Sequence, residues 1–427
     1  MKEVSNISKV FQSILKGGET FFVQGAMQTP SFLLEELEET LQNEREDVKN
    51  LRFIHLHTHG QPFYIREDFK DRCKTLNFFV GGNIRSSINY KNIDYIPCFL
   101  SEIPYLLRDK VVPVDIALIQ TSKPDEHGHV SIGSSVDITR EAIKAAKYVI
   151  AVINENVPRV YGDSFIHIND IDYGIIKNTP LHTVELNQIS NEEKKIGETI
   201  ASLIEDGSTL QMGIGAIPDA VLRELKSHKD LGIHTEMFSN GVIDLINDGI
   251  INNSKKKINP GKTITSFAVG DQTLVDYINK NAAIEFYPAN YVNKPKNIAK
   301  NPKVIAINSA VEIDLTGQVC ADSIGHKIIS GVGGQMDFMR GASISAGGKP
   351  IIAMSSTTKK GVSKITPFLK KGAGVVTTRS HIHYVVTEYG VVNLYGKSIG
   401  QRAKELISIA HPEHRERLER EWFELYN

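Results

Sequence analysis

Cysteine, tryptophan and long apolar segments are scarce in this sequence. Its 427 residues include three cysteines and one tryptophan. Cys73, Cys98 and Cys320 stand alone, without the paired CxxC spacing of a structural zinc site. This odd, sparse set argues against a disulfide framework and fits a reducing compartment. We therefore expect a cytoplasmic protein with single buried thiols.

Signals for membrane insertion or secretion are also lacking. The longest apolar runs, such as residues 111–119 and 148–153, are interrupted or end well before the roughly 18 residues that a membrane helix needs. The first 16 residues contain no uninterrupted apolar segment followed by small residues. We expect neither a membrane span nor a signal peptide.

Charge of one sign is not in excess. Lysine and arginine number 49 and the acidic residues 50, which gives a formal net charge of −1. This balance provides no electrostatic case for a nucleic acid or membrane partner. With 41% hydrophobic and 23% charged residues, the composition is that of a globular protein long enough for two domains.

Short runs rich in valine and isoleucine alternate with longer amphipathic stretches. This alternation predicts an α/β fold with open, mainly parallel sheets, because strands buried on both faces have continuous apolar sequences. The expected buried strands are residues 52–57, 116–121, 148–154, 209–212, 304–308, 350–355 and 374–378.

A change to polar sequence near residue 187 marks a candidate domain boundary. Ser190 followed by Glu193 forms a capping-box pattern, which predicts the start of a helix. Its expected apolar face consists of Ile196, Ile200, Leu203 and Ile204. We therefore expect an N-terminal α/β domain over residues 1–186 and a C-terminal α/β domain over residues 187–427.

An internal similarity supports two related domains. Residues 18–37 and 207–225 both contain a turn, an apolar strand, a glycine-containing loop and a helix with proline in its first turn. Each is followed by an apolar segment that contains histidine. The alternative is that any two strand–loop–helix units resemble one another, since glycine, proline and leucine are common.

The loop of the second copy, residues 211–218, has the chemistry of a ligand site. Gly213 and Gly215 lie where a strand passes into a helix, so the backbone can approach a ligand closely and the helix N-terminus favours an anion. As a dinucleotide fingerprint the loop is incomplete, because Pro218 replaces the third glycine. No GxxxxGK[ST] run is present, which argues against an ATP-driven P-loop enzyme.

A carboxylate follows about twenty residues later. Glu236 ends a short apolar segment and precedes Gly241, and ligands of parallel α/β sheets bind at the carboxyl ends of strands. Glu236 is therefore a candidate nucleophile or base. The alternative is a surface carboxylate that caps the next helix.

Three glycines in four positions, Gly331, Gly333 and Gly334, form a further candidate site. Successive backbone N–H groups in such a stretch can point at one oxygen, as an oxyanion hole requires. A plain tight turn is the alternative.

Two other clusters are weaker candidates. His55, His57 and His59 would share one face of a strand, but no carboxylate adjoins them, so we expect a pocket lining or a domain interface and no metal site. The lysine-rich runs 255–257 and 359–360 are expected to be solvated loops, although Lys359 follows a strand and could reach a phosphate.

Together these segments resemble the acetyl-CoA hydrolase/transferase family of class I CoA-transferases, and within it the 4-hydroxybutyrate CoA-transferases. The resemblance extends over nearly the whole chain. It rests on the ordered motifs FVGGN (79–83), YIP (95–97), LSEIP (100–104), PDEHG (124–128), GIGAIP (213–218), HTEM (234–237), GVGGQMDF (331–338) and TEYG (387–390).

The resemblance implies a role for each candidate residue. It implies two similar open α/β domains with the active site between them, and a homodimer or higher homo-oligomer. Glu236 would be the catalytic glutamate, and Gly334 would supply an oxyanion N–H group and contact coenzyme A. The remaining coenzyme A contacts would come from Gly213, Ile214, Gly215, Ala216, Ile217 and, with a less certain alignment, Lys359.

The implied activity is transfer of coenzyme A between an acyl-CoA and a short-chain carboxylate such as acetate, butyrate or 4-hydroxybutyrate. The implied route is ping-pong, through an acyl-glutamyl anhydride and a glutamyl-CoA thioester. Acyl-CoA is a substrate, and no permanently bound cofactor or metal is expected. Hydrolysis of acetyl-CoA at the same site is the alternative. A phosphosugar isomerase or a ligand-sensing protein on a related fold is more remote.

Overall fold

The computed structural model describes residues 1–184 and 188–426, which form two compact units. The first unit contains residues 1–185 together with 264–291, and the second contains 186–263 together with 292–427. Segment 264–291 thus differs from the sequence-based division, which assigned it to the C-terminal domain. The boundary predicted at residues 186 and 187 lies outside the described residues and stays a prediction.

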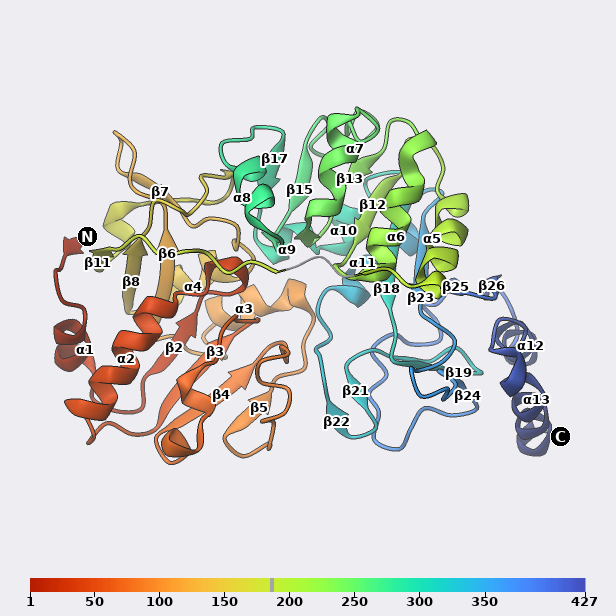
Figure 1. Cartoon of the computed structure of the whole chain (residues 1–427), viewed down its shortest axis with the longest axis horizontal. Coiled ribbons are helices and arrows are strands. Elements are labelled where there is room, and N and C mark those ends of the chain that lie inside the picture. Colours follow the sequence, from red (N-terminus) through yellow and green to blue (C-terminus); the bar gives the residue numbers. More distant parts are fainter. Residues whose placement is uncertain (185–187, 427) are drawn as a thin grey trace. The chain divides into compact units, whose positions relative to one another are not determined.

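The first unit contains an eight-stranded sheet in the order β1-β11-β8-β6-β2-β3-β4-β5, with all neighbours parallel (Figure 1). In the first of its two chain segments, the helices and strands of this unit are β1 (Lys2–Glu3), α1 (Ser8–Ile14), β2 (Thr20–Val23), α2 (Ser31–Asn43), β3 (Leu51–His55), β4 (Cys73–Asn77), β5 (Ile93–Tyr95), α3 (Ile103–Arg108), β6 (Ile116–Thr121), β7 (His129–Ser131), α4 (Thr139–Ala145), β8 (Tyr148–Ile153), β9 (Tyr161–Gly162), β10 (Phe165–His167) and β11 (Tyr173–Ile176). Its later segment adds β15 (Thr263–Thr265), β16 (Phe267–Ala268), α8 (Gln272–Ile278), β17 (Ile284–Phe286) and the start of α9 (Ala289–Val292).

The second unit contains a six-stranded sheet in the order β13-β12-β18-β23-β25-β26, in which only the β25–β26 pair is antiparallel. Its elements are α5 (Asn191–Leu203), β12 (Thr209–Met212), α6 (Ala216–Glu224), β13 (Gly232–Ile233), β14 (Met237–Phe238), α7 (Ile243–Asn247), α10 (Pro295–Ile298), β18 (Val304–Ser309), β19 (Glu312–Asp314), β20 (Val319–Cys320), β21 (Ser323–Ile324), β22 (Lys327–Ile328), α11 (Gln335–Ile344), β23 (Lys349–Ala353), β24 (Ile365–Thr366), β25 (Tyr384–Thr387), β26 (Gly390–Asn393), α12 (Ile399–Ser408) and α13 (Pro412–Tyr426).

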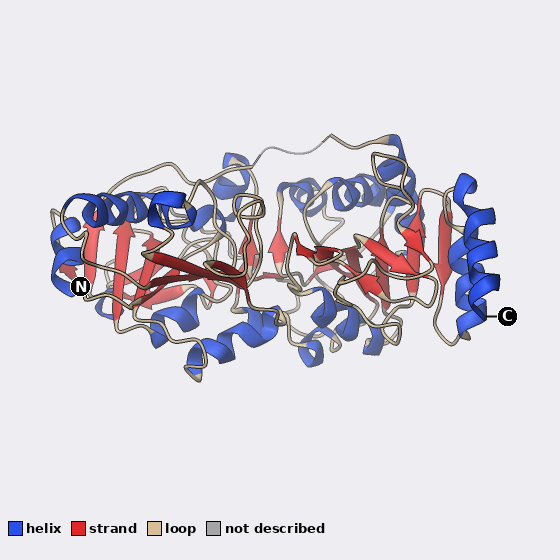
Figure 2. Cartoon of the chain, turned by 90° about the horizontal axis from the view of Figure 1, so that it is seen from below, coloured by secondary structure: helices blue, strands red, loops and turns tan. Residues whose placement is uncertain are grey.

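The two sheets share an arrangement of five strands. In the first unit the order β3-β2-β6-β8-β11 follows the same course as β13-β12-β18-β23-β25 in the second. The sequence copies noted above correspond to β2 and α2 in one unit and to β12 and α6 in the other. Within each unit, helices lie on both faces of the sheet (Figure 2). The predicted α/β class with two similar, open, mainly parallel sheets is therefore confirmed.

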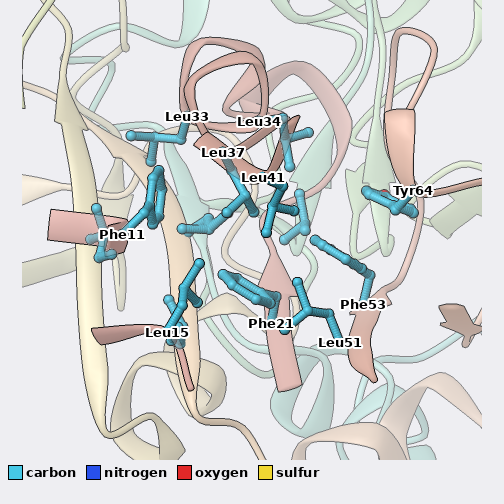
Figure 3. Packing of buried hydrophobic residues seen from close by; sticks show 14 of the residues in the cluster. Phe11, Leu15, Phe21, Leu33, Leu34, Leu37, Leu41, Leu51, Phe53 and Tyr64 are labelled. Atoms are coloured by element: carbon cyan, nitrogen blue, oxygen red, sulfur yellow. The ribbon is translucent and has the colours of Figure 1, made fainter. Parts of the chain in front are cut away.

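The core of the first unit explains why its strands have continuous apolar sequences. Phe21 of β2 and Phe53 of β3 stack with ring centroids 5.0 Å apart, on the face covered by α1 and α2 (Figure 3). Leu33 and Leu37 of α2 pack into the same cluster. The opposite face is also buried, as Ile54 shows, so both faces of the parallel sheet select apolar side chains.

The helix predicted from the capping box begins where expected. Ser190 Oγ accepts from the Glu193 N–H at 3.2 Å, and Glu193 Oε2 accepts from the Ser190 N–H at 2.8 Å. Ile196 and Ile200 of this helix, α5, are buried. Gly197 faces α6 closely, since a Cβ there would lie 2.8 Å from atoms of Ala220.

One expected strand is wrong. Residues 374–378 form no strand, and only Thr377 makes an isolated bridge, to Val319. The sheet position beside β23 is taken by β25 instead. Val375 is 44% exposed, so this run is not covered on both faces as a central strand would be.

The structure tests the expectations of single buried thiols and of no membrane-spanning helix. Cys73, Cys98 and Cys320 are free, and the first and third are buried. Within residues 1–184 and 188–426, no helix combines the length and the apolarity that crossing a bilayer demands.

Leu37→Ala should lower the free energy of unfolding by about 2–5 kcal/mol, because it opens a cavity among fully buried side chains. Urea denaturation would measure the change. Glu39→Ala, at an exposed position on the same helix, is the matched control and should change the value by no more than about 0.5 kcal/mol. Equal effects would contradict the assignment of this core.

Candidate active site

The carboxyl edge of the second unit's sheet collects the candidate residues. The loop 213–215 follows β12, and Glu236 comes three residues after β13, which pairs with β12 in parallel. Thr235 links the two segments, because its hydroxyl lies 3.0 Å from the Met212 carbonyl oxygen and 3.1 Å from that of Met237. Ligands of open parallel sheets bind at this edge.

The glycine loop has the backbone geometry that the sequence indicated. Gly215 has φ +128° and ψ 175°, a conformation that residues with a Cβ rarely adopt. It is the N-cap residue of α6, and nothing lies within 4 Å of a Cβ placed on it. Ile214 is half exposed. The loop therefore leaves an open approach to the N-terminal N–H groups of α6.

Glu236 is partly accessible and has a defined partner. Asn293 Nδ2 donates to Glu236 Oε2 at 2.8 Å. Burial raises the pKa of the Glu236 carboxyl to about 7, and the hydrogen bond from Asn293 acts in the opposite direction. A carboxyl group with this pKa exchanges its proton near neutral pH and is available as a nucleophile or a base above it.

Gly334 lies directly against this carboxylate. A Cβ on Gly334 would overlap both Glu236 Oε2 and Asn293 Nδ2. Gly334 is the N-cap residue of α11 with φ −94° and ψ 4°, so close approach, and not a left-handed backbone, requires glycine here. The preceding Gly333 has φ +57°. The sequence candidates Glu236 and Gly334 are thus adjacent.

Asn293 was not identified from the sequence. It follows α9, lies 57 positions beyond Glu236, and is fully buried. No motif distinguishes it from the neighbouring asparagines of this segment, Asn290 and Asn297. Only the folded chain brings its amide to the carboxylate.

Lys359 lines a cleft of about 720 Å³ that also includes Ala216, the first residue of α6. Ser355 and Glu388 contribute to the same cleft. Lys359 itself is exposed, in the turn after β23. The structure thus brings two of the candidate coenzyme A contacts, Ala216 and Lys359, to one cavity.

A second cation adjoins this cleft. Lys364 Nζ donates to Ser355 Oγ at 3.2 Å, and burial lowers its pKa while Glu388 acts to raise it. Glu388, in the TEYG motif, accepts from the Ser356 N–H at 2.8 Å and from the Ser356 hydroxyl at 2.6 Å. Lys364 belongs to none of the sequence motifs described above.

Comparison with known families identifies the chain. The N-terminal domain model of acetyl-CoA hydrolase/transferase matches residues 2–185, and the C-terminal domain model matches residues 270–422. The chain belongs to the acetyl-CoA hydrolase/transferase family.

Its relatives include several transferases. The chain is 48% identical to the succinyl-CoA:acetate/propanoyl-CoA:succinate CoA transferase of Fasciola hepatica, over 99% of this chain and 88% of that protein. It is 50% identical to the 4-hydroxybutyrate coenzyme A transferase of Clostridium kluyveri, over 91% and 90% of the two chains. The solved 4-hydroxybutyrate CoA-transferase of Porphyromonas gingivalis superimposes with a TM-score of 0.84 at 37% identity, covering 100% of this chain and 98% of that chain.

Relatives named as hydrolases are more distant. The acetyl-CoA hydrolase of Yarrowia lipolytica is 26% identical, over 79% of this chain and 72% of that protein. The chain is therefore an enzyme of the CoA-transferase type, which acts on CoA thioesters and carboxylates.

The histidines at positions 55, 57 and 59, in the enzyme's first unit, do not share one strand. Strand β3 ends at His55, which is fully buried, whereas His57 packs against Phe267 with ring centroids 4.9 Å apart. His59 stacks on His182 at 5.5 Å. Among the residues that the structure describes, no group of three or more histidine, cysteine or acidic side chains could hold a metal ion.

The prediction of a solvated lysine run at 255–257 is wrong for its central residue. Lys256 is only 3% exposed, and its Nζ donates to the carbonyl oxygen of Ile233 at 2.8 Å. Lys255 and Lys257 are exposed as expected. A run of lysines ordinarily indicates a solvent-facing segment, but the Ile233 carbonyl oxygen that Lys256 meets lies 23 positions away in the chain.

Gly334→Ala should leave the fold intact, because its φ and ψ are open to alanine, but should displace the Glu236 carboxylate. A displacement of about 1 Å costs on the order of 100-fold in rate. Steady-state CoA transfer would measure it, with Gly400→Ala, whose Cβ would meet nothing within 4 Å, as the control. Full activity of Gly334→Ala would contradict the close packing.

Proposed function

We propose that the enzyme transfers coenzyme A between an acyl-CoA and a short-chain carboxylate, with Glu236 as the covalent nucleophile. The observation that carries the proposal is the Glu236 carboxylate, which has a pKa of about 7 and contacts both Asn293 and Gly334. A partly accessible carboxylate at the carboxyl edge of a parallel sheet is suited to attack a bound thioester.

The reaction balances without ATP, metal or redox chemistry. Glu236 attacks the thioester carbonyl and expels CoA thiolate, which leaves an acyl-glutamyl anhydride. The thiolate then attacks the glutamyl carbonyl, releases the acyl group as a carboxylate and leaves a glutamyl-CoA thioester. An incoming carboxylate attacks that thioester, and the same two steps in reverse release the new acyl-CoA and free Glu236.

Two donors would stabilise the charge that develops in these steps. The Asn293 amide already donates to Oε2, so it can remain on this oxygen as the glutamyl carbonyl becomes an oxyanion. The backbone of Gly334 adjoins the same oxygen, and its N–H would serve as the second donor. One such donor contributes about 3 kcal/mol to transition-state stabilisation.

Coenzyme A would bind along the glycine loop and the adjoining cleft. The open approach at Gly213, Ile214 and Gly215 and the N-terminus of α6 at Ala216 and Ile217 suit an anionic ligand. Lys359 lines the cleft that includes Ala216 and could pair with a phosphate. Binding energy from this remote part of the substrate helps to place the thioester against a weak nucleophile.

A short-chain carboxylate is the proposed acceptor. The names of the transferases above include the carboxylates acetate, succinate and 4-hydroxybutyrate. Gln28, which follows β2 in the first unit, is fully buried and donates to Ser134 Oγ at 3.1 Å. Phe338 is also fully buried and belongs to the core.

Four broader proposals accompany this function. Free cysteines support a reducing, cytoplasmic location. A homodimer or higher homo-oligomer is proposed from the family resemblance. The division into domains 1–186 and 187–427 is proposed from the change to polar sequence near residue 187, with residues 264–291 packed in the first unit. Coenzyme A would be a substrate, with no cofactor bound permanently.

Incubation with acetyl-CoA or butyryl-CoA should add the mass of coenzyme A less water to the wild-type protein, because the glutamyl thioester accumulates without an acceptor. Intact-protein mass spectrometry would detect it. Glu236→Gln should form no adduct, and added acetate should discharge the wild-type adduct. Acyl-CoA consumption without an adduct or an acceptor would instead favour the hydrolase, and no turnover with either substrate would contradict the acyl class.

Adduct formation should depend on the ionisation of Glu236. Because its pKa is raised to about 7, the carboxyl is protonated and unreactive below that pH. The rate should fall about tenfold per pH unit on the acid side and level off on the alkaline side. Single-turnover rates from about pH 5 to 9 would test this. A flat profile down to pH 5 would contradict the raised pKa.

A further inference from the structure

The strand before Glu236 is short and lies at the edge of its sheet. Strand β13 pairs with β12 on one side, where the N–H groups of Gly232 and His234 donate to the carbonyl oxygens of Ser208 and Leu210. The backbone groups of Ile233 point the other way, as alternation along a strand requires. On this outer edge the backbone of Leu231 bridges to Ile251, and Ile233 lies two residues beyond that bridge.

Two side chains of the loop 252–262 bond this outer edge. Asn253 Oδ1 accepts from the Ile233 N–H at 2.8 Å, and Lys256 Nζ donates to the Ile233 carbonyl oxygen at 2.8 Å. Lys256 Nζ also donates to the Lys262 carbonyl oxygen at 2.5 Å. Both polar groups of Ile233, three residues before Glu236, are thus bonded by side chains that are 4% and 3% exposed.

His234 connects the same strand to the partner of Glu236. Its Nε2 lies 2.8 Å from the Val292 carbonyl oxygen, which can only accept, so Nε2 carries the proton. Burial, and next the charge of Lys256, lower the pKa of His234 to about 3, which keeps the ring neutral. Val292 directly precedes Asn293, whose amide donates to Glu236 Oε2.

These side chains carry a cost that packing alone does not explain. His234 Nδ1 is buried, and no partner for it occurs in the described part of the chain. Lys256 places an ammonium group in the interior, where a charge is expensive even when it is hydrogen-bonded. An apolar residue at either position would avoid these costs. Their common feature is that they fix the two segments that meet at Glu236.

We propose that His234 and Lys256 are positioning residues for Glu236: Lys256 fixes the end of β13 through the Ile233 carbonyl, and His234 fixes the Asn293 amide through the Val292 carbonyl. The hydrogen bonds of both side chains to the Ile233 and Val292 carbonyl oxygens reach the site through the backbone. The inference rests on the proposed function, since it concerns the geometry of the same nucleophile.

Pairs of substitutions distinguish the loss of a hydrogen bond from the loss of side-chain volume. His234→Phe keeps the ring but removes the donor, whereas His234→Gln can place an amide N–H near the Nε2 position. Lys256→Met keeps the aliphatic stem and removes the ammonium. Lys255→Met, at the exposed neighbour, is the control. Urea denaturation of each full-length variant establishes that it folds.

The rate of CoA adduct formation with saturating acetyl-CoA is the readout, along with its half-saturation concentration and pH midpoint. His234→Phe and Lys256→Met should lower the rate about 10- to 100-fold and leave half-saturation within about twofold. The pH midpoint should rise, because the hydrogen bond from Asn293 opposes the effect of burial on Glu236. His234→Gln and Lys255→Met should stay within about threefold of wild type.

Each outcome bears on the inference. Wild-type rate and pH midpoint in folded His234→Phe and Lys256→Met would overturn it, as would a loss in His234→Gln as large as in His234→Phe. If His234→Phe does not fold, Lys256→Met against Lys255→Met decides. Absence of an adduct on the wild-type enzyme would instead overturn the proposed function, so the two failures are distinguishable.

Discussion

The contact between the Glu236 carboxylate and the backbone at Gly334 is the constraint on which the site depends. A carboxylate is a weak nucleophile when fully hydrated, and it is protonated when burial raises its pKa too far. Here burial raises the pKa to about 7, and one amide hydrogen bond limits the rise. The absence of a side chain at Gly334 is what allows the carboxylate and the Asn293 amide to occupy the same small space.

The two units share a strand order but differ at the carboxyl edge of the sheet. In the first unit that edge is filled by buried amides: Gln24 Oε1 accepts from the Gln120 N–H at 2.7 Å, and Asn154 Nδ2 donates to Gln120 Oε1 at 2.9 Å. The loop after β2 is closed as well, since a Cβ on Gly25 would overlap the His57 carbonyl oxygen. Around Gly215 of the second unit the corresponding loop is open. Similar sheets thus carry a network of buried amides in one unit and an accessible loop in the other.

Sequence patterns correctly predicted those elements whose conformation is determined by residues close to them in the sequence. The capping box at Ser190 and the glycine loop before α6 could be predicted because their geometry is decided within a few residues. The run 374–378 was assigned to a strand on composition alone, and composition does not say which apolar run pairs with β23. Segment 264–291 likewise joins the first unit through pairing such as that of β17 with β9, which no local signal reveals.

The residues around the nucleophile also differ in whether nearby sequence or distant contacts determine their role. Glu236 and Gly334 belong to short motifs with recognisable chemistry, so they could be predicted as candidates. Asn293 and Lys256 could not, because their roles come from single hydrogen bonds to residues 57 and 23 positions away. Lys256 even carries a misleading signal, since a run of lysines ordinarily marks solvent. A buried ammonium group needs hydrogen-bond acceptors in place of water, and the Ile233 carbonyl oxygen meets Lys256 only once β13 has folded beside the loop 252–262. The contacts that support the nucleophile therefore form only when the sheet assembles. The reacting residues can be recognised from short sequence motifs, whereas the residues that position them cannot.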